Sequence, residues 1–120
     1  MKDLKKRIID ISYKLQLSHV SSCLTAVDII AEIYTKRRKP EDLVVISQGH
    51  TGLALYVVLE KYLGINAEYL FHKHGVHPNR DLENGIYCST GSLGCGLPIA
   101  LGMALADKTR NVYCLISAGS

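Results

Sequence analysis

The chain reads Cys88-Ser-Thr-Gly-Ser-Leu-Gly-Cys-Gly-Leu-Pro98 and continues without a charged residue into Ile99-Ala-Leu-Gly-Met-Ala-Leu-Ala106. Gly91, Gly94 and Gly96 therefore precede an apolar run of helical length. Glycine permits positive φ and lets a ligand approach the backbone closely. The free N–H groups at the start of the next helix would face the same point, which suits an anion. A glycine-rich turn before a buried helix is the alternative, and spacing alone does not separate the two.

Length and composition indicate one modest globular domain, or part of a larger one. The chain has 120 residues, of which 48% are hydrophobic and 21% are charged, so it is neither disordered nor fibrous. The net charge of +3 comes mainly from the runs 2–7 and 36–39. Such runs are typical of solvated helix faces, and no interleaved aromatic residues suggest a nucleic-acid surface.

Cysteine usage and the N-terminus predict a cytoplasmic protein. The four cysteines form no CxxC pair, and Met1 is followed by charged residues in place of an apolar leader, so free and mostly buried thiols are expected. No apolar run approaches the roughly 20 residues that span a bilayer. We therefore expect no membrane segment.

Apolar spacing predicts helices that alternate with short buried strands. Helices are expected over about 3–16, from Thr25 to the basic run at 36–39, from about 51 to 63, over 66–72 and over 96–107. The runs 43–46 and 111–116 are typical of strands buried on both faces. Residues 18–22 and 72–84 are polar, so loops are expected there. The last helix is apolar nearly all round, so we expect it to be central.

This pattern favours a helix-rich α/β fold with a parallel sheet, specifically an incomplete doubly wound one. Two strands make a marginal sheet, because parallel strands need cover on both faces. Either more sheet comes from another chain, or the chain is truncated. An open sheet edge and an apolar helix also predict self-association or pairing with another subunit.

Five histidines lie in loops or at the starts of elements, where functional residues concentrate. His50 follows the strand at 43–46 and opens a helix, so it should share one sheet edge with the glycine-rich stretch. A histidine that merely caps its helix is the alternative. His72, His74 and His77 could suggest a metal cluster, but no cysteine lies nearby, and we predict no independent metal site.

Several segments together resemble one known family, the transketolases. They are Ser18-His19, Leu24–Ile30, Ile46–Gly52, His77-Pro78 and Ser89–Leu97, and they occur in the family's order and approximate spacing. The resemblance implies that residues 1–120 form the N-terminal part of a thiamine-diphosphate-binding domain. In this family, the active site forms where that domain meets a second, pyrimidine-binding domain.

The resemblance also implies roles for six residues and a reaction. The residues implied to bind the cofactor are His50, Gly91, Leu93 and Gly94. The residues implied to be catalytic are His19 and His77, which would transfer protons at the sugar substrate. Thiamine diphosphate with magnesium would carry out transfer of a two-carbon ketol unit between sugar phosphates. Imidazole suits the proton transfers because it titrates near neutral pH.

The chain departs from the family pattern at its end. The family's Gly-Asp-Gly, whose aspartate binds magnesium, corresponds here to Ser117-Ala118-Gly119-Ser120. An alanine side chain has no oxygen for magnesium. Cys95 also replaces a usual glutamine. Two hypotheses follow: a transketolase component that needs other chains, either a homo-oligomer or a complementary subunit, or a non-catalytic relic or binding module that has lost the metal and cofactor. Both predict no transketolase activity for the isolated chain.

Overall fold

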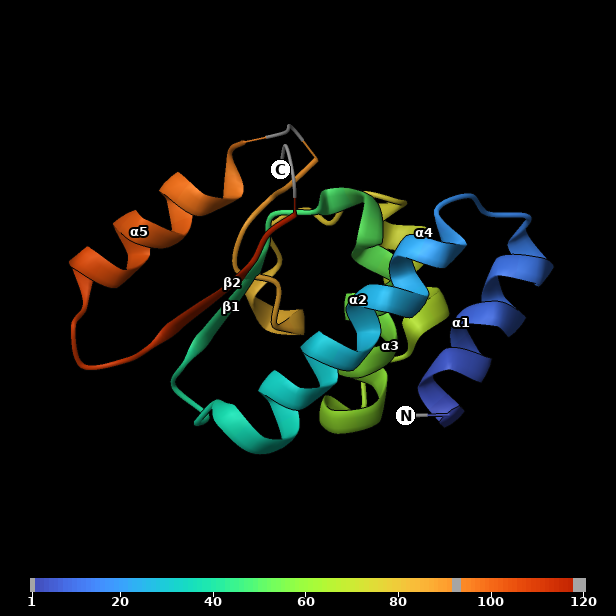
Figure 1. Ribbon diagram of the computed structural model, residues 1–120, viewed down its shortest axis with the longest axis horizontal. Helices are drawn as coiled ribbons and strands as arrows, with labels where there is room; N and C mark the ends of the chain where they lie inside the picture. Colours follow the sequence, from blue (N-terminus) through green and yellow to red (C-terminus); the bar gives the residue numbers. More distant parts are fainter. Residues whose placement is uncertain (1, 92–93, 118–120) are drawn as a thin grey trace.

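The computed structural model describes residues 2–91 and 94–117 (Figure 1). Five α-helices and two strands make up most of the described chain. They are α1 (Lys2–Leu15), α2 (Val20–Glu32), β1 (Leu43–Ile46), α3 (Gly52–Leu63), α4 (Ala67–His74), α5 (Gly96–Ala106) and β2 (Val112–Leu115). Short helical turns add η1 (Ile33–Arg37), η2 (Gly49–Thr51) and η3 (Leu82–Asn84).

The two strands pair in parallel, as the sequence predicts. Leu43 lies opposite Val112, and Ile46 lies opposite Leu115. Asp42 ties the starts of the strands together, because its carboxylate accepts hydrogen bonds from the backbone N–H groups of Lys39 at 3.0 Å and Asn111 at 2.9 Å. These bonds lower the pKa of the Asp42 carboxyl. The helix-rich α/β class with a small parallel sheet is thus confirmed.

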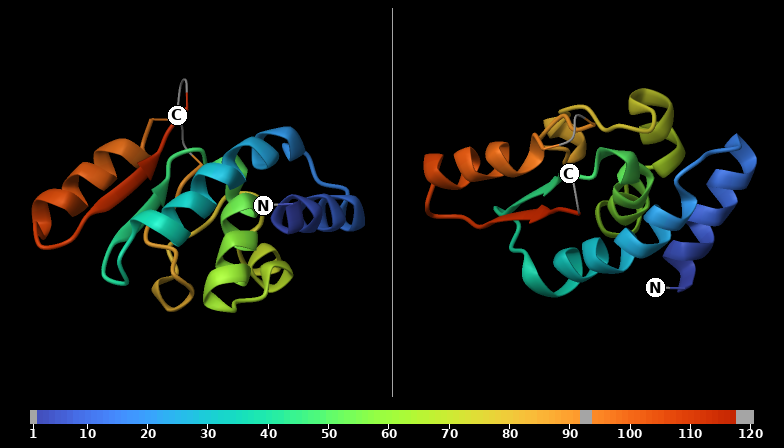
Figure 2. Two further views of the ribbon diagram at one scale, coloured as in Figure 1. Left: turned by 60° about the horizontal axis from the view of Figure 1, so that its bottom comes forward. Right: turned by 45° about the horizontal axis from the view of Figure 1, so that its top comes forward.

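Alternating side chains of the strands pack into two cores on opposite faces of the sheet. Val44, Ile46 and Leu115 join the large core that α1, α2, α3 and α4 build. Val45 packs instead with Ala100 of α5. Figure 2 shows α5 alongside β2, with α1 at the far side of the molecule. Helices therefore cover both faces of the sheet, which is the arrangement that parallel strands require.

Helix α3 is the centre of the large core, because every residue from Gly52 to Leu59 is buried. It ends where Gly64 adopts the left-handed conformation, with φ of 74°, and its N–H donates to the Glu60 carbonyl. This glycine C-cap ends the helix at Leu63, where the sequence predicts its end. Asn66 then caps α4, since its side-chain oxygen accepts a hydrogen bond from the Tyr69 N–H at 2.8 Å.

The predicted start of the second helix at Thr25 is wrong, and so is the predicted loop over residues 20–22. Helix α2 begins at Val20, and the Thr25 hydroxyl donates to the Ser21 carbonyl one turn earlier at 3.1 Å. The Thr25 hydroxyl thus has its hydrogen-bond acceptor inside the helix, and Thr25 does not cap the helix N-terminus. No side-chain hydrogen bond caps the N-terminus of α2.

The prediction that the apolar helix near the C-terminus is central is also wrong. In α5 only Gly96 and Ala100 are buried, while Leu101 is 59% exposed and Leu105 is 62% exposed. The cause is geometric, because a two-stranded sheet offers this helix only one narrow face. Three of the four β2 residues are likewise only partly buried.

The four cysteines are free thiols, but only Cys23 and Cys88 are buried, so the expectation of mostly buried thiols holds for half of them. Cys95 is exposed, and Cys114 is partly buried. Over the described ranges, the helices fall short of the length and hydropathy that a membrane crossing needs.

Candidate functional site

The glycines on either side of the sheet's carboxyl edge bring two distant segments into direct backbone contact. Gly49 follows β1, and a Cβ atom placed on it would lie 2.5 Å from the backbone nitrogen of Gly91 and 2.6 Å from its Cα. The Gly49 position leaves no room for a side chain. The close approach therefore explains why a glycine is needed after β1.

A second close approach joins the start of α5 to the end of β1. A Cβ atom placed on Gly96 would lie 2.5 Å from the Ser47 Cβ and 2.6 Å from its hydroxyl oxygen. Ser47 is almost fully buried. Among the described residues, the Ser47 and Thr90 hydroxyls have no hydrogen-bond partner. These two buried hydroxyls are therefore candidate hydrogen-bonding groups for a polar ligand at this edge, because buried polar groups are normally paired.

Two of the five histidines meet beside this edge. The rings of His19 and His50 lie 5.2 Å apart between centroids and are tilted by 55°. His50 lies in η2 directly after Gly49, and His19 immediately precedes α2. His19 adopts the left-handed conformation, with φ of 62° and ψ of 23°, and makes no side-chain cap hydrogen bond. Backbone strain of this kind clusters at functional sites.

The strain at His19 predicts a measurable difference between two substitutions. His19→Gly is expected to be more stable to unfolding than His19→Ala by about 1 kcal/mol, because only glycine adopts the left-handed conformation without a Cβ penalty. Both variants remove the imidazole, so the ring contact with His50 cancels in the comparison. Urea unfolding followed by circular dichroism measures the difference, and equal stabilities would contradict it.

His77 lies on the other side of the Gly91 backbone. A Cβ atom placed on Gly91 would lie 3.0 Å from the Cγ atom of the His77 ring. Gly91 has φ of 144°, in the region that favours glycine. The Thr90 N–H donates to the Pro78 carbonyl at 3.1 Å, which holds the two segments together. His77 and Gly49 therefore contact the same short piece of backbone.

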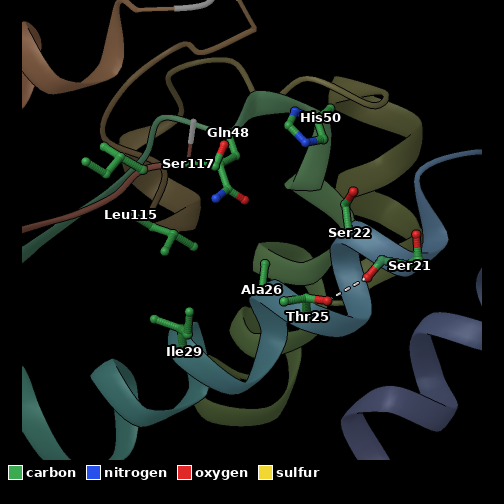
Figure 3. A pocket seen from close by; sticks show the side chains of 10 residues that line it. Ser21, Ser22, Thr25, Ala26, Ile29, Gln48, His50, Leu115 and Ser117 are labelled. Atoms are coloured by element: carbon green, nitrogen blue, oxygen red, sulfur yellow. Dashed lines mark hydrogen bonds between the residues drawn. The ribbon is translucent and has the colours of Figure 1, made fainter. Parts of the chain in front are cut away.

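A pocket of about 360 Å³ opens beside His50 (Figure 3). Residues at or after the carboxyl ends of β1 and β2 line it on one side, and the first turns of α2 line it on the other. They are Ser21, Ser22, Thr25, Ala26, Ile29, Gln48, His50, Leu115, Ile116 and Ser117. Hydroxyl, amide and imidazole groups gather at the His50 end, and aliphatic side chains form the other end. This division suits a ligand with one polar end and one apolar end.

Most of the predicted site residues thus lie at one edge of the sheet. His19, His50, His77 and Gly91 come together there, while Gly94 is exposed, and a Cβ atom placed on it would have open space around it. Leu93, the sixth of them, lies outside the described residues, as does Ala118. Across residues 2–91 and 94–117, no three His, Cys, Asp or Glu side chains gather as a metal-binding group.

The sequence analysis missed several residues around the site. Ser21 and Thr25 both line the pocket because they stand four residues apart on one face of α2. That spacing could have revealed them, but the wrong helix start placed Ser21 in a loop. Gln48 lies within the segment Ile46–Gly52 that resembles the family, but no role of its own was predicted for it from the sequence. Nothing in the sequence pattern pointed to Asp81.

Asp81 is the acceptor for a cluster of side chains next to the loop that carries His77. Its Oδ2 atom accepts hydrogen bonds from Lys73 Nζ at 2.8 Å and from Asn84 Nδ2 at 2.7 Å. His74 Nε2 lies 3.0 Å from the same oxygen. Chiefly through Lys73 and Asn84, this cluster lowers the pKa of the Asp81 carboxyl to about 2.

The lowered Asp81 pKa predicts that part of the stability depends on pH. A carboxyl with a lower pKa in the folded chain stabilises it above the ordinary pKa of 3.8, and the contribution disappears as the pH falls to about 2. The difference in unfolding free energy between the wild type and Asp81→Asn should therefore be largest above about pH 5 and should shrink toward about pH 2. Urea unfolding at a series of pH values measures it. A difference that stays constant over this window would contradict the assignment.

Comparison with known proteins places the chain in a family. It is 31% identical over 119 residues to one subunit of the apulose-4-phosphate transketolase of Phocaeicola vulgatus, covering 87% of this chain and 42% of that protein. It is 33% identical over 135 aligned positions to the 6-deoxy-6-sulfo-D-fructose transketolase subunit SqwG of Clostridium sp., covering 97% of this chain and 49% of that protein. The chain belongs to the transketolase family.

A transketolase of Mycoplasma pneumoniae also matches, at 36% identity over 106 residues, covering 75% of this chain and 16% of that protein. The chain thus spans less than half the length of each of these three transketolase relatives. No family model matches the chain, and no solved structure matches it.

Proposed function

We propose that residues 1–120 form the N-terminal part of a transketolase-type domain that binds thiamine diphosphate, and that this part works in an enzyme completed by other chains. The observation that carries the proposal is the meeting of Gly49, Gly91 and three imidazoles at the carboxyl edge of the sheet. Ligands of open α/β sheets bind at that edge. Helices on both faces of the sheet fit part of a doubly wound domain.

The residues at the edge fit the diphosphate end of the cofactor. The backbones of Gly49 and Gly91 pack so closely that a Cβ atom on Gly49 would clash with Gly91, which brings the turn after β1 and the segment before α5 together at this edge. We propose that the diphosphate binds where these two segments meet. The buried Ser47 and Thr90 hydroxyls lack partners among the described residues and are candidate donors to phosphate oxygens. His50, which lies directly after Gly49, would add a further donor on the same side.

The three imidazoles then have two roles. His50 would hold the diphosphate, and His19 and His77 would face the sugar and hold or move protons at its hydroxyl and carbonyl oxygens. When bound, thiamine diphosphate supplies the chemistry that breaks and remakes the carbon–carbon bond. Gly91 and Gly94, with Leu93 outside the described residues, would line the cofactor.

Magnesium does not fit the residues of this chain. Magnesium requires oxygen ligands in near-octahedral geometry, and Ala118 has no side-chain oxygen at the position where the family has an aspartate. We therefore derive no step through a metal. This substitution also favours the second candidate function, a non-catalytic binding module or relic of a transketolase.

The names of the relatives support a partner and a substrate class. Two of them are named as subunits, which supports a complementary chain that supplies the rest of the site. One name specifies apulose 4-phosphate, which supports a sugar phosphate as substrate for two-carbon ketol transfer. The exposed apolar side chains of α5 are where we expect another chain, or a second copy, to pack.

Calorimetric titration with thiamine diphosphate tests the proposal, with thiamine as the probe that lacks phosphates. Thiamine diphosphate should bind and thiamine should not. His50→Ala should weaken the binding at least about tenfold, a loss of about 1.4 kcal/mol, because it removes a diphosphate contact. The matched control is His72→Ala, which removes an exposed imidazole from α4. It should bind like the wild type.

Repeating the titration with magnesium separates the two candidate functions. Affinity that rises with magnesium supports the enzyme component, with metal ligands other than the side chain at 118. Absence of binding under both conditions contradicts the component and favours the relic. Ketol transfer by the isolated chain, assayed with a ketose phosphate and an aldose acceptor, would contradict the need for another chain.

A further inference from the structure

The loop over residues 75–81 carries His77 and is fixed to α3 along its first half. The Tyr56 hydroxyl donates a hydrogen bond to the Gly75 carbonyl at 2.9 Å. A Cβ atom placed on Gly52 would lie 2.5 Å from the Val76 carbonyl oxygen, so the loop lies directly on the first turn of α3. The most buried helix of the molecule therefore supports this side of the loop.

The second half of the loop is fixed by Asp81. Its side chain is only 8% exposed and pairs with Lys73 and with His74, whose side chain is 4% exposed. The His74 ring in turn stacks on the Tyr56 ring, with centroids 6.2 Å apart. Asp81 also pairs through its backbone with Ile86, N–H to carbonyl in both directions, at 2.7 and 3.0 Å. Both ends of the loop thus meet at the pair of His74 and Tyr56.

We propose that Asp81 is a positioning residue that holds the His77 imidazole against the Gly91 backbone. The carboxylate binds the last turn of α4 to the far end of the loop, and His77 lies between these two attachments. With the carboxylate gone, the loop keeps its Tyr56 attachment and the backbone bonds of Pro78 and Asp81 but loses the side-chain bonds to α4, and we expect the imidazole to move away from Gly91. The task of His77 at a substrate rests on the proposed function, but its placement is a property of this chain alone.

The proposal is tested by proton NMR on the full chain. In the wild type, we expect a nuclear Overhauser effect between the His77 ring protons and the Gly91 Hα protons, because a Cβ placed on Gly91 would lie 3.0 Å from that ring. Asp81→Asn should weaken it by about half or more, since the effect falls steeply with proton separation. The matched control is Glu83→Gln, an exposed acid two residues away, which should leave it unchanged.

Measurements well below the unfolding midpoint separate positioning from stability. If Asp81 were only a stabilising residue, the folded population would keep the full His77 to Gly91 effect, and this result would overturn the proposal. If Asp81→Asn does not fold, Lys73→Met replaces it, because that change removes the bond from the last turn of α4 to the Asp81 carboxylate. The nuclear Overhauser effect between His77 and Gly91 should weaken in this variant as well, and a full effect would overturn the proposal.

This outcome is independent of the proposed function. Failure of the wild type to bind thiamine diphosphate would overturn the proposed function and leave the NMR result standing. If binding is found, Asp81→Asn should retain it to within about twofold, or about 0.4 kcal/mol, since Asp81 contacts none of the residues assigned to the diphosphate. Loss of the NMR effect with retained binding is the combination that both proposals expect.

Discussion

Gly49→Ala is expected to lower the free energy of unfolding by about 3 kcal/mol, the upper end of what overpacking costs. The new methyl carbon would lie 2.5 Å from the Gly91 nitrogen and 2.7 Å from the Thr90 carbonyl carbon. All of the clashing atoms are backbone, so no side chain can rotate to make room. The only relief is to separate the turn after β1 from the segment before α5.

The matched control for this change is Gly102→Ala in α5. No heavy atom lies within 4 Å of a Cβ placed on Gly102, and the residue is exposed in the middle of a helix. Alanine there should raise the free energy of unfolding by about 0.5–1 kcal/mol, because it restricts the unfolded chain and favours the helix. Urea unfolding followed by circular dichroism measures both variants. If Gly49→Ala and Gly102→Ala behaved alike, the backbone contact at the sheet edge would be wrong.

The same contact gives Gly49→Ala a consequence for binding. Separating the turn at Gly49 from Gly91 moves apart the two segments that are proposed to bind the diphosphate. His50, which directly follows Gly49, would move with the turn. We therefore expect the variant to lose thiamine diphosphate binding even at temperatures where it stays folded.

Periodicity predicted most elements because their signals are local. The run at 43–46 has no polar residue to break a buried strand, and Gly64 ends α3 by a left-handed cap that few other residues adopt. The start of α2 was not predicted, for a reason that is not local. His19 takes up a strained conformation just before the helix, and propensity does not foresee a conformation that tertiary contacts hold in place.

Burial was predicted less well than element type, because it depends on what lies next to an element. The composition of α5 predicts a helix that is buried all round, yet Leu105 is 62% exposed. A helix that meets only two strands buries one narrow stripe, here with Ala100 at its centre. Sequence reports the hydropathy of a residue but not the size of the surface opposite it.

The candidate site was predictable where backbone topology decides it. Parallel strands place their carboxyl ends at one edge, so His50 and the glycines before α5 had to meet there. The pairing of Asp81 with His74 was not predictable, because it depends on how the loop over residues 75–81 folds back on α3. Charged residues in polar segments are usually solvated, and the sequence around Asp81 does not distinguish it from the exposed Glu83.

Tyr56→Ala is expected to lower the free energy of unfolding by about 4 kcal/mol, as large-to-small changes at fully buried aromatic positions do. Tyr56 is fully buried and is the largest side chain so enclosed. Its ring packs edge-on against Phe71, with centroids 6.4 Å apart, and stacks on His74. Burial also raises the pKa of its hydroxyl, which stays protonated and donates to Gly75.

Tyr56→Phe isolates the hydroxyl from the ring. It should cost only about 1–2 kcal/mol, because it keeps the packing and leaves the Gly75 carbonyl without its donor. Tyr13→Ala is the control for loss of a tyrosine ring, since Tyr13 on α1 is 87% exposed and its removal should change stability by about 0.5 kcal/mol or less. Urea unfolding of the three variants measures the series. Equal costs for Tyr56→Ala and Tyr56→Phe would mean that the ring adds nothing to the core. Because the same residue supports the loop that carries His77, its ring stabilises the fold while its hydroxyl places part of the candidate site.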